Sequence, residues 1–494
     1  MTTDAPTAPT AAGQPDPRRW LALAVLGVAY LMVVLDVSIV NVALPSIQTD
    51  LGFSPEDLQW VVSGYALTFG GFLLLGGRLG DVLGRRRLFM IGLAAFAVFS
   101  ALCALSQTDT MLIVARLLQG AGAALLAPSV FSITLVTFEE GSDRNKALGI
   151  LGAIAGAGAA IGVLLGGVLT EYAGWEWVFW INVPIGLITL FFVPRFVRES
   201  RIEGMARNFD ALGAVCVTAS LLLLVFGLTQ ANQEGWTSAQ TIGVLVASAV
   251  LMAVFLVIES RNRHALMPLS FFKRRTPTGA NIVGLLLGTI VFSMFFLLSL
   301  YMQQVLGFSA LKTGVGYLAV ALTAVVASGV AQALVTRMGV KPILAVGMTF
   351  ILAGLIWFTQ IPVDGSYLVN LFGGFMLIGI GLGFSFVPVS IAALAGVPPQ
   401  EAGLASGLIN TSQQIGGALG VAILTTVSTT RTENLVSDGT SQPQALTDGF
   451  ALAFWVAAGF AVVAILATLF TIKGEDVATE GEGEGEGATA PAPM

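Results

Sequence analysis

The chain is dominated by long runs of apolar residues, and short segments rich in charged or turn-forming residues separate each run from the next. Fourteen runs hold about 18 or more mostly apolar residues, which is the length that a helix needs to cross the roughly 30 Å hydrocarbon core of a bilayer. Strands of a membrane barrel would instead alternate polar and apolar residues over about ten positions. We therefore predict an all-α integral membrane protein with 14 transmembrane helices. The predicted spans are 20–43, 58–78, 88–105, 110–136, 147–170, 177–194, 211–229, 241–259, 279–303, 313–335, 342–361, 368–396, 404–428 and 450–472.

The composition agrees with this assignment, because 55% of the 494 residues are hydrophobic and only 11% are charged. Soluble domains carry roughly 25% charged residues, so lipid must cover much of this chain. The formal net charge of -6 depends on a low-complexity C-terminal tail that holds four glutamates in the segment EGEGEGEG. We expect residues 1–17 and 474–494 to be disordered and cytoplasmic. The charge gives no indication of a nucleic-acid partner.

The charged loops predict the orientation, since Lys and Arg accumulate in cytoplasmic loops. If the N-terminus is cytoplasmic, 20 of the 23 Lys and Arg residues fall in cytoplasmic segments and only Lys312 and Arg431 fall outside. An even number of spans then places both termini in the cytoplasm, and we expect a multi-pass protein of the inner (cytoplasmic) membrane. The loops are too short for a catalytic domain, and the chain has one histidine and two cysteines. We therefore expect neither an enzyme nor a metal site.

The two halves of the chain share a weak internal repeat. The segment ALGILGAIAGAGAAIG contains Gly158 and Gly162, and it superposes on ASGLINTSQQIGGALG, with Gly416 and Gly420, after a shift of 258 residues. Duplicated halves are common in transporters, whose substrate site lies between the halves near the bilayer midplane. We predict two six-helix bundles with two inserted helices between them. The expected divisions are 1–17, the N-terminal bundle 18–196, the inserted pair with its linkers 197–276, the C-terminal bundle 277–473 and the tail 474–494.

The strongest local motif is GGRLGDVLGRRRLF at residues 76–89, at the inner end of the second predicted span. Its glycines allow close helix packing and a sharp turn, and its aspartate and arginines can pair across a helix boundary. The motif resembles the cytoplasmic loop signature of the major facilitator superfamily. This resemblance implies a latch on the cytoplasmic side rather than a substrate site. The matching residues are Gly77, Asp81, Gly84, Arg85 and Arg86.

Three further segments resemble motifs of the fourteen-span drug:proton antiporters, the quaternary-ammonium and uncoupler exporters of this superfamily. LDVSIVNVALPSI at 35–47 resembles their helix 1 motif, RLLQGAGAA at 116–124 the helix 4 motif, and GAGAAIGVLLGG at 156–167 the helix 5 antiporter motif. The resemblance implies the major facilitator fold and export in exchange for protons. Two residues depart from it. Val163 stands where the antiporter motif usually has proline, which leaves the bend of that helix open, and Glu176 stands where relatives usually have arginine.

Only two ionisable residues lie clearly inside the predicted spans, Asp36 in the first and Arg116 in the fourth. Ionisable residues inside a membrane are costly and mark functional sites. Both lie about six or seven residues from the outer end of their span, or roughly 10 Å at 1.5 Å per residue, so they could meet across the bundle. We interpret Asp36 as the proton-exchanging group and Arg116 as the residue that tunes its proton affinity. The alternatives are a static ion pair between two helices and direct binding of a cationic substrate.

The fifth predicted span is rich in glycine and alanine at helical spacing. Small residues let helices approach closely inside a membrane, so this span should pack tightly against a neighbour. The contact either packs statically or slides during alternating access, and the sequence leaves both open. The glycines of the antiporter motif are Gly158, Gly162, Gly166 and Gly167.

Polar side chains in other spans are candidates for the wall of a substrate cavity, although each could instead bond between helices. No acid lies inside the last six predicted spans. Substrate contacts there would therefore be amide, hydroxyl, aromatic and apolar groups, which suit lipophilic compounds. The candidates are Asn41, Asn281, Gln332, Asn410 and Gln413.

These features favour a proton-coupled antiporter that exports amphipathic or lipophilic small molecules, such as drugs or antibiotics, by alternating access. Its expected partners are the substrate, protons and membrane lipids. We expect a monomer that needs no cofactor beyond the proton motive force. A transporter of an endogenous metabolite or lipid, or an uptake system, is the alternative. A membrane enzyme or receptor is disfavoured, because the chain offers no nucleophile constellation or paired carboxylates.

Overall fold

The computed structural model describes residues 18–138, 142–200, 210–262, 269–397 and 402–472. Helices joined by short turns make up this part of the chain, and no strand occurs within it. Each of the 14 predicted spans overlaps one helix of the structure or two consecutive helices. The elements are α1 (Arg19–Leu51), α2 (Pro55–Leu58), α3 (Trp60–Leu83), α4 (Arg85–Ala104), α5 (Asp109–Thr137), α6 (Ser142–Tyr172), α7 (Trp177–Trp180), α8 (Asn182–Phe196), α9 (Ala211–Glu234), α10 (Ala239–Arg261), η1 (Leu269–Lys273), α11 (Arg275–Leu300), η2 (Tyr301–Val305), α12 (Ala310–Met338), α13 (Val340–Phe358), η3 (Tyr367–Leu371), α14 (Phe372–Leu394), α15 (Ala402–Ser437) and α16 (Gln442–Thr471).

Eleven helices among the described residues are long and apolar enough to cross a membrane. The chain is thus a multi-pass membrane protein, as predicted, but three of the 14 predicted spans fall outside this set. In α6 and α9 the described side chains give apolar stretches of fewer than 18 residues, Ala160–Tyr172 and Leu212–Leu228. The third is α15, which carries amide and hydroxyl side chains along much of its length.

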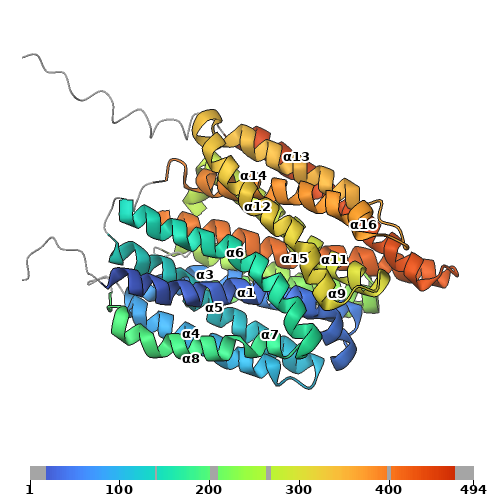
Figure 1. Cartoon of the computed structure of the whole chain (residues 1–494), viewed down its shortest axis with the longest axis horizontal. Coiled ribbons are helices and arrows are strands. Elements are labelled where there is room, and N and C mark those ends of the chain that lie inside the picture. Colours follow the sequence, from blue (N-terminus) through green and yellow to red (C-terminus); the bar gives the residue numbers. More distant parts are fainter. Residues whose placement is uncertain (1–17, 139–141, 201–209, 263–268, 398–401, 473–494) are drawn as a thin grey trace, which may run out of the picture.

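The long helices lie alongside one another, and by their place in the sequence they are divided into an N-terminal set and a C-terminal set. In the N-terminal set, α1 packs on α6 and α8, while α3 and α4 pack on α5. In the C-terminal set, α11 packs on α15 and α16, while α12 and α13 pack on α14. Figure 1 shows α4, α5 and α8 on one side of the molecule and α13, α14 and α16 on the other. The sets meet where α6 contacts α12 and α3 contacts α15.

The internal repeat corresponds to equivalent helix contacts in the two sets. A Cβ atom on Gly158 of α6 would lie 3.0 Å from the Leu31 side chain of α1. At the position 258 residues later, a Cβ atom on Gly416 of α15 would lie 1.9 Å from the Leu285 carbonyl oxygen of α11. The repeated glycines therefore bring the fifth helix of each set close to the first.

Helix α9 lies where the two sets meet, and α10 lies on its other side. Helix α9 contacts both α3 and α15, and α10 packs on α9. Ser220 and Ser248 join these two helices, because each hydroxyl donates to the other residue's carbonyl oxygen at 2.8 Å. Such hydrogen bonds help to hold helices together where lipid supplies no hydrophobic driving force.

Candidate functional site

The two ionisable residues predicted to meet across the bundle are in direct contact. Arg116 Nη1 of α5 donates to Asp36 Oδ2 of α1 at 2.6 Å. Asp36 is 0% exposed and Arg116 is 1% exposed, so the pair is shielded from both solvent and lipid. Removing two charges from water is costly, and good geometry with additional hydrogen bonds is needed to offset that cost.

The additional hydrogen bonds come from two other helices, α3 and α8, and from α5 itself. Gln119 Nε2 and Asn182 Nδ2 donate to Asp36 Oδ1 at 2.8 and 3.0 Å. Arg116 Nη1 also donates to Gln119 Oε1 at 2.7 Å, and Arg116 Nε donates to the Val61 carbonyl oxygen at 2.9 Å. The carboxylate thus accepts three hydrogen bonds, the number that fits its ionised form.

Aromatic rings enclose the arginine. The Arg116 guanidinium carbon lies 4.2 Å from the centre of the Tyr65 ring and 5.6 Å from that of the Phe179 ring. Contacts of this kind stabilise a desolvated cation by about 2 kcal/mol or more. The Tyr65 hydroxyl is buried and has no hydrogen-bond partner in the part of the chain that the structure describes.

Local sequence explains how these side chains converge. Arg116 and Gln119 are three residues apart on α5 and therefore share one helix face. Asn182 opens α8 just after the break at Ile181, where the chain passes from α7 to α8. Ser100 of α4 accepts from Asn182 Nδ2 at 3.1 Å and donates to the Phe179 carbonyl oxygen at 2.8 Å.

Sequence reasoning missed Gln119, Asn182, Ser100 and Tyr65. A signal was present for two of them. Gln119 belongs to the segment RLLQGAGAA that already contains Arg116, and Asn182 is an amide in the apolar run 177–194. For the other two, an ordinary hydroxyl in an apolar span carries no information about which neighbour it faces.

The loop signature forms a tight turn between α3 and α4. Gly84 has a φ of 108°, which favours glycine, and a Cβ atom there would lie 2.8 Å from Glu199 Oε1. The Glu199 carboxylate accepts from the backbone N–H groups of Arg86 and Arg87 at 3.0 and 3.2 Å, so it caps the start of α4. The side chain of Asp81 lies outside the described residues, and its role as a latch stays a prediction.

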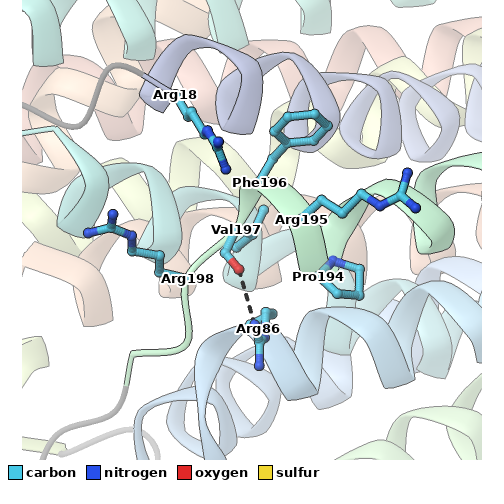
Figure 2. A pocket seen from close by; sticks show the side chains of 7 residues that line it. All are labelled: Arg18, Arg86, Pro194, Arg195, Phe196, Val197 and Arg198. Atoms are coloured by element: carbon cyan, nitrogen blue, oxygen red, sulfur yellow. Dashed lines mark hydrogen bonds between the residues drawn. The ribbon is translucent and has the colours of Figure 1, made fainter.

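A hollow of about 270 Å³ adjoins this turn at the end of α8. In Figure 2, Arg18 and Arg86 approach Val197 from opposite sides, and Arg86 Nη1 donates to the Val197 carbonyl oxygen at 3.4 Å. Arg195 and Arg198 extend away from each other to either side of the chain. Basic side chains at a helix C-terminus complement its exposed carbonyl groups, which explains the arginines here without a ligand.

The glycines of the antiporter motif join α6 to both sets of helices. A Cβ atom would lie 2.0 Å from Ser38 Oγ at Gly162 and 2.6 Å from the Ile39 carbonyl oxygen at Gly166. At Gly167 it would lie 2.8 Å from the carbonyl oxygen of Ala310, at the start of α12. Helix α6 runs without interruption from Ser142 to Tyr172 through Val163, the position where the motif usually has proline.

The predicted cavity residues have different environments. Asn41 and Asn281 are buried and donate within their own helices to the carbonyl oxygens four residues before them, and Asn281 Oδ1 also accepts from Ser412 at 2.9 Å. Gln332 and Asn410 are exposed on α12 and α15, and Gln413 is half-buried. The assignment of all five to a substrate cavity stays a prediction.

Glu176, which stands where relatives usually have arginine, lies at the opposite end of the helices from the loop signature. It lines a hollow of about 860 Å³ together with Asp50 and Glu171. Gln303 and Gln304 of η2 line the same hollow from the C-terminal set. Two hydrogen bonds join the two sets of helices beside this hollow. Gln303 Nε2 donates to the carbonyl oxygen of Val42 at 2.9 Å, and Gln304 Nε2 donates to Gln48 Oε1 at 2.6 Å.

Comparison with known proteins places the chain in a family. The sequence model of the Major Facilitator Superfamily matches residues 26–421. The chain therefore belongs to the Major Facilitator Superfamily, a superfamily of membrane transporters, and the resemblance seen in the loop signature is confirmed.

Several curated relatives are named as exporters or resistance proteins. The puromycin resistance protein of Streptomyces alboniger is 38% identical over 457 residues, which cover 92% of this chain and 90% of that protein. The cephamycin export protein of Amycolatopsis lactamdurans is 40% identical over 410 residues, which cover 82% and 84%. The tetracenomycin C resistance and export protein of Streptomyces glaucescens is 33% identical over 500 residues, which cover 93% and 92%.

Solved structures show the same fold. A bacterial homologue of the human lysosomal transporter Spinster, in an inward-facing and unoccupied conformation, superposes with a TM-score of 0.67. It is 15% identical, and the match covers 94% of this chain and 99% of that chain. At this identity the likeness supports the fold alone.

Proposed function

We propose that this protein exports amphipathic or lipophilic small molecules, antibiotics among them, from the cytoplasm in exchange for protons. The observation that carries the proposal is the fully buried carboxyl group of Asp36 inside a helix of a chain whose relatives are named for antibiotic resistance and export. Burying an acid inside a membrane protein is costly. Proton exchange at this carboxyl group would explain why an acid is present there despite that cost.

The proposed scaffold has 14 spans with both termini in the cytoplasm, and it works as a monomer. Residues 18–196 and 277–473 form its two bundles, and residues 197–276 carry the inserted pair. The contacts of α1 with α6 and of α3 and α4 with α5, together with the matching contacts of α11 with α15 and of α12 and α13 with α14, support this division. The position of α9 against α3 and α15 supports the reading of α9 and α10 as an insertion.

In the proposed cycle, the arrangement around Asp36 in the structure is the proton-free state. A proton that arrives from outside forms an O–H bond on Asp36 and removes its negative charge, which weakens its attraction to Arg116. Helices α1 and α5 are then free to change their relative position. At the cytoplasmic side, substrate binding favours the ion pair again, and the proton leaves Asp36 for the cytoplasm.

The energy available from the proton gradient is consistent with the exchange of one proton per transport cycle. One proton that crosses 100 mV releases about 2.3 kcal/mol, which sustains roughly a fifty-fold gradient of a neutral substrate. With one acid inside the predicted spans, we propose one proton per cycle. Neutral substrates would then be driven by both the membrane potential and the pH gradient, whereas monovalent cations would exchange electroneutrally and be driven by the pH gradient alone.

The test begins with a susceptibility panel of a deletion strain against lipophilic cations and antibiotics. Accumulation of an identified compound is then measured in inverted membrane vesicles. Nigericin, which collapses the pH gradient, should stop accumulation of a monovalent cation, whereas valinomycin, which collapses the potential, should not. Accumulation that survives both ionophores together would overturn proton coupling, and movement only in the opposite direction would favour the uptake alternative.

A further inference from the structure

The polar contacts that the structure describes for Asp36 all come from donors. Arg116 donates to Oδ2 at 2.6 Å, and Gln119 and Asn182 donate to Oδ1 at 2.8 and 3.0 Å. This set satisfies a carboxylate, which only accepts hydrogen bonds. A protonated Asp36 is itself a donor, and a buried donor that has no acceptor is strongly disfavoured. The network therefore has to supply an acceptor whenever the proton is bound.

Among the described groups that contact Asp36, only Asn182 has an acceptor atom without a hydrogen-bond partner. Gln119 Oε1 already accepts from Arg116 Nη1 at 2.7 Å and from Cys103 Sγ at 3.5 Å. The Arg116 guanidinium has no acceptor at all. Asn182 Oδ1 is buried and has no hydrogen-bond partner in the described residues, on a side chain only 1% exposed.

The orientation of the Asn182 amide follows from its neighbours. Its Nδ2 faces both Asp36 Oδ1 and Ser100 Oγ, at 3.0 and 3.1 Å. Ser100 has one hydrogen, which it donates to the Phe179 carbonyl oxygen at 2.8 Å. Ser100 Oγ can therefore only accept from Asn182. Because both facing atoms accept, the amino end of the amide must point at them while Asp36 is ionised.

We propose that Asn182 is the positioning residue for the transported proton, with an amide that donates to the Asp36 carboxylate and, after half a turn, accepts from the Asp36 carboxylic acid. Binding the proton forms the O–H bond on Asp36 and replaces the bond from Asn182 Nδ2 with one to Asn182 Oδ1. Ser100 can follow by turning its hydrogen from Phe179 to the same Oδ1. This inference rests on the proposed proton exchange at Asp36.

Protonation of Asp36 would also change hydrogen bonds on the neighbouring helices. The titratable groups around Asp36 are its partner Arg116 from α5, Tyr65 from α3 and Cys103 from α4. Asn182 is the contact from α8, at the break after α7, and Ser100 connects it to the backbone of α7 at Phe179. A half-turn of one amide thus changes the hydrogen bonds that hold α1, α4, α7 and α8 together.

The experiment is pH-difference infrared spectroscopy of the full-length protein in lipid. The carboxylic-acid C=O band that Asp36→Asn abolishes is assigned to Asp36. In the wild type we expect this band at the low frequency of an acid that donates a hydrogen bond. Asn182→Leu, of similar volume but without an amide, should move the band to higher frequency and reduce proton-driven export about tenfold or more.

Two controls separate a specific role from a structural one. Ser100→Ala leaves Asn182 in place and should keep the low-frequency band, and Asn182→Gln, which retains both a donor and an acceptor, should restore it at least in part. An Asp36 band at the wild-type position in Asn182→Leu would overturn this inference but leave the proposed function intact. If no acid band depends on Asp36, the proposed proton exchange itself fails.

Discussion

The close contact between α6 and α1 at Gly162 predicts that Gly162→Ala destabilises the protein. The new Cβ atom would lie 2.0 Å from Ser38 Oγ, 3.1 Å from Ser38 Cβ and 3.2 Å from the Leu35 carbonyl oxygen. The first contact cannot persist, and overpacking of this kind costs about 1–3 kcal/mol of unfolding free energy. The other two contacts require shifts of only a few tenths of an ångström.

Removing the obstructing atom should therefore rescue the variant. Ser38 Oγ donates only within its own helix, to the Val34 and Leu35 carbonyl oxygens, both at 3.1 Å. Such bonds contribute little to helix stability, so Ser38→Ala alone should be nearly neutral. We expect the double variant Gly162→Ala with Ser38→Ala to recover most of the loss, with a coupling free energy of about 1–2 kcal/mol.

The assay is unfolding of the purified protein in mixed micelles, with transport measured in parallel. Gly459→Ala on α16, where a Cβ atom meets nothing within 4 Å, is the matched control and should not destabilise. A Gly162→Ala protein as stable as the wild type, or one that Ser38→Ala fails to rescue, would refute the reasoning. Recovery of stability without transport would favour a sliding contact, and recovery of both would favour static packing.

Three further predictions concern the two ends of the helices. Glu199→Gln removes the charged cap from α4 and should lower the unfolding free energy by about 0.5–2 kcal/mol, with an unchanged unfolding curve as the contrary result. Burial and the nearby charge of Glu56 raise the pKa of Glu433, so the native state binds this proton more tightly than the unfolded chain does. Stability should then fall as pH rises through the range just above the ordinary glutamate pKa; Glu433→Gln should flatten that pH profile, and an unaltered profile would count against it. Impermeant thiol reagents should label a cysteine at Ser437 only from outside and one at Lys273 only from the cytoplasm, whereas the same side for both would break the proposed topology.

Hydropathy predicted where the helices lie, but it does not show which helices are covered by other helices rather than by lipid. Helix α6 lies between α1 and α12, and α15 lies between α3 and α11. Because protein rather than lipid covers much of α15, amide and hydroxyl side chains are tolerated there, and the apolar signal of this helix is weak. Helix α1 also continues past the predicted end at residue 43 to Leu51, since helical hydrogen bonding does not stop where the apolar run stops.

Counting residues from the span ends was enough to predict that Asp36 and Arg116 could meet. It was not enough to predict Asn182, because the sequence does not say that α8 packs on α1. The Glu199 cap was missed for the same reason, since it comes from a segment more than 100 residues away from the turn that it stabilises. The depth of a residue in the membrane can be predicted from its own helix alone. The partners of its side chain depend on which helices are neighbours, which the sequence does not state.

Asp36→Asn tests the central claim most directly, because the substitution preserves the size of the side chain but removes the proton site. In inverted vesicles energised with a pH gradient, the variant should bind substrate and exchange it downhill but should not concentrate it. Asp36→Glu, which keeps a carboxyl group at a displaced position, should retain part of the concentrating activity. Concentration of substrate by Asp36→Asn against its gradient would contradict proton exchange at Asp36 and would leave the pair with Arg116 as a static link between α1 and α5.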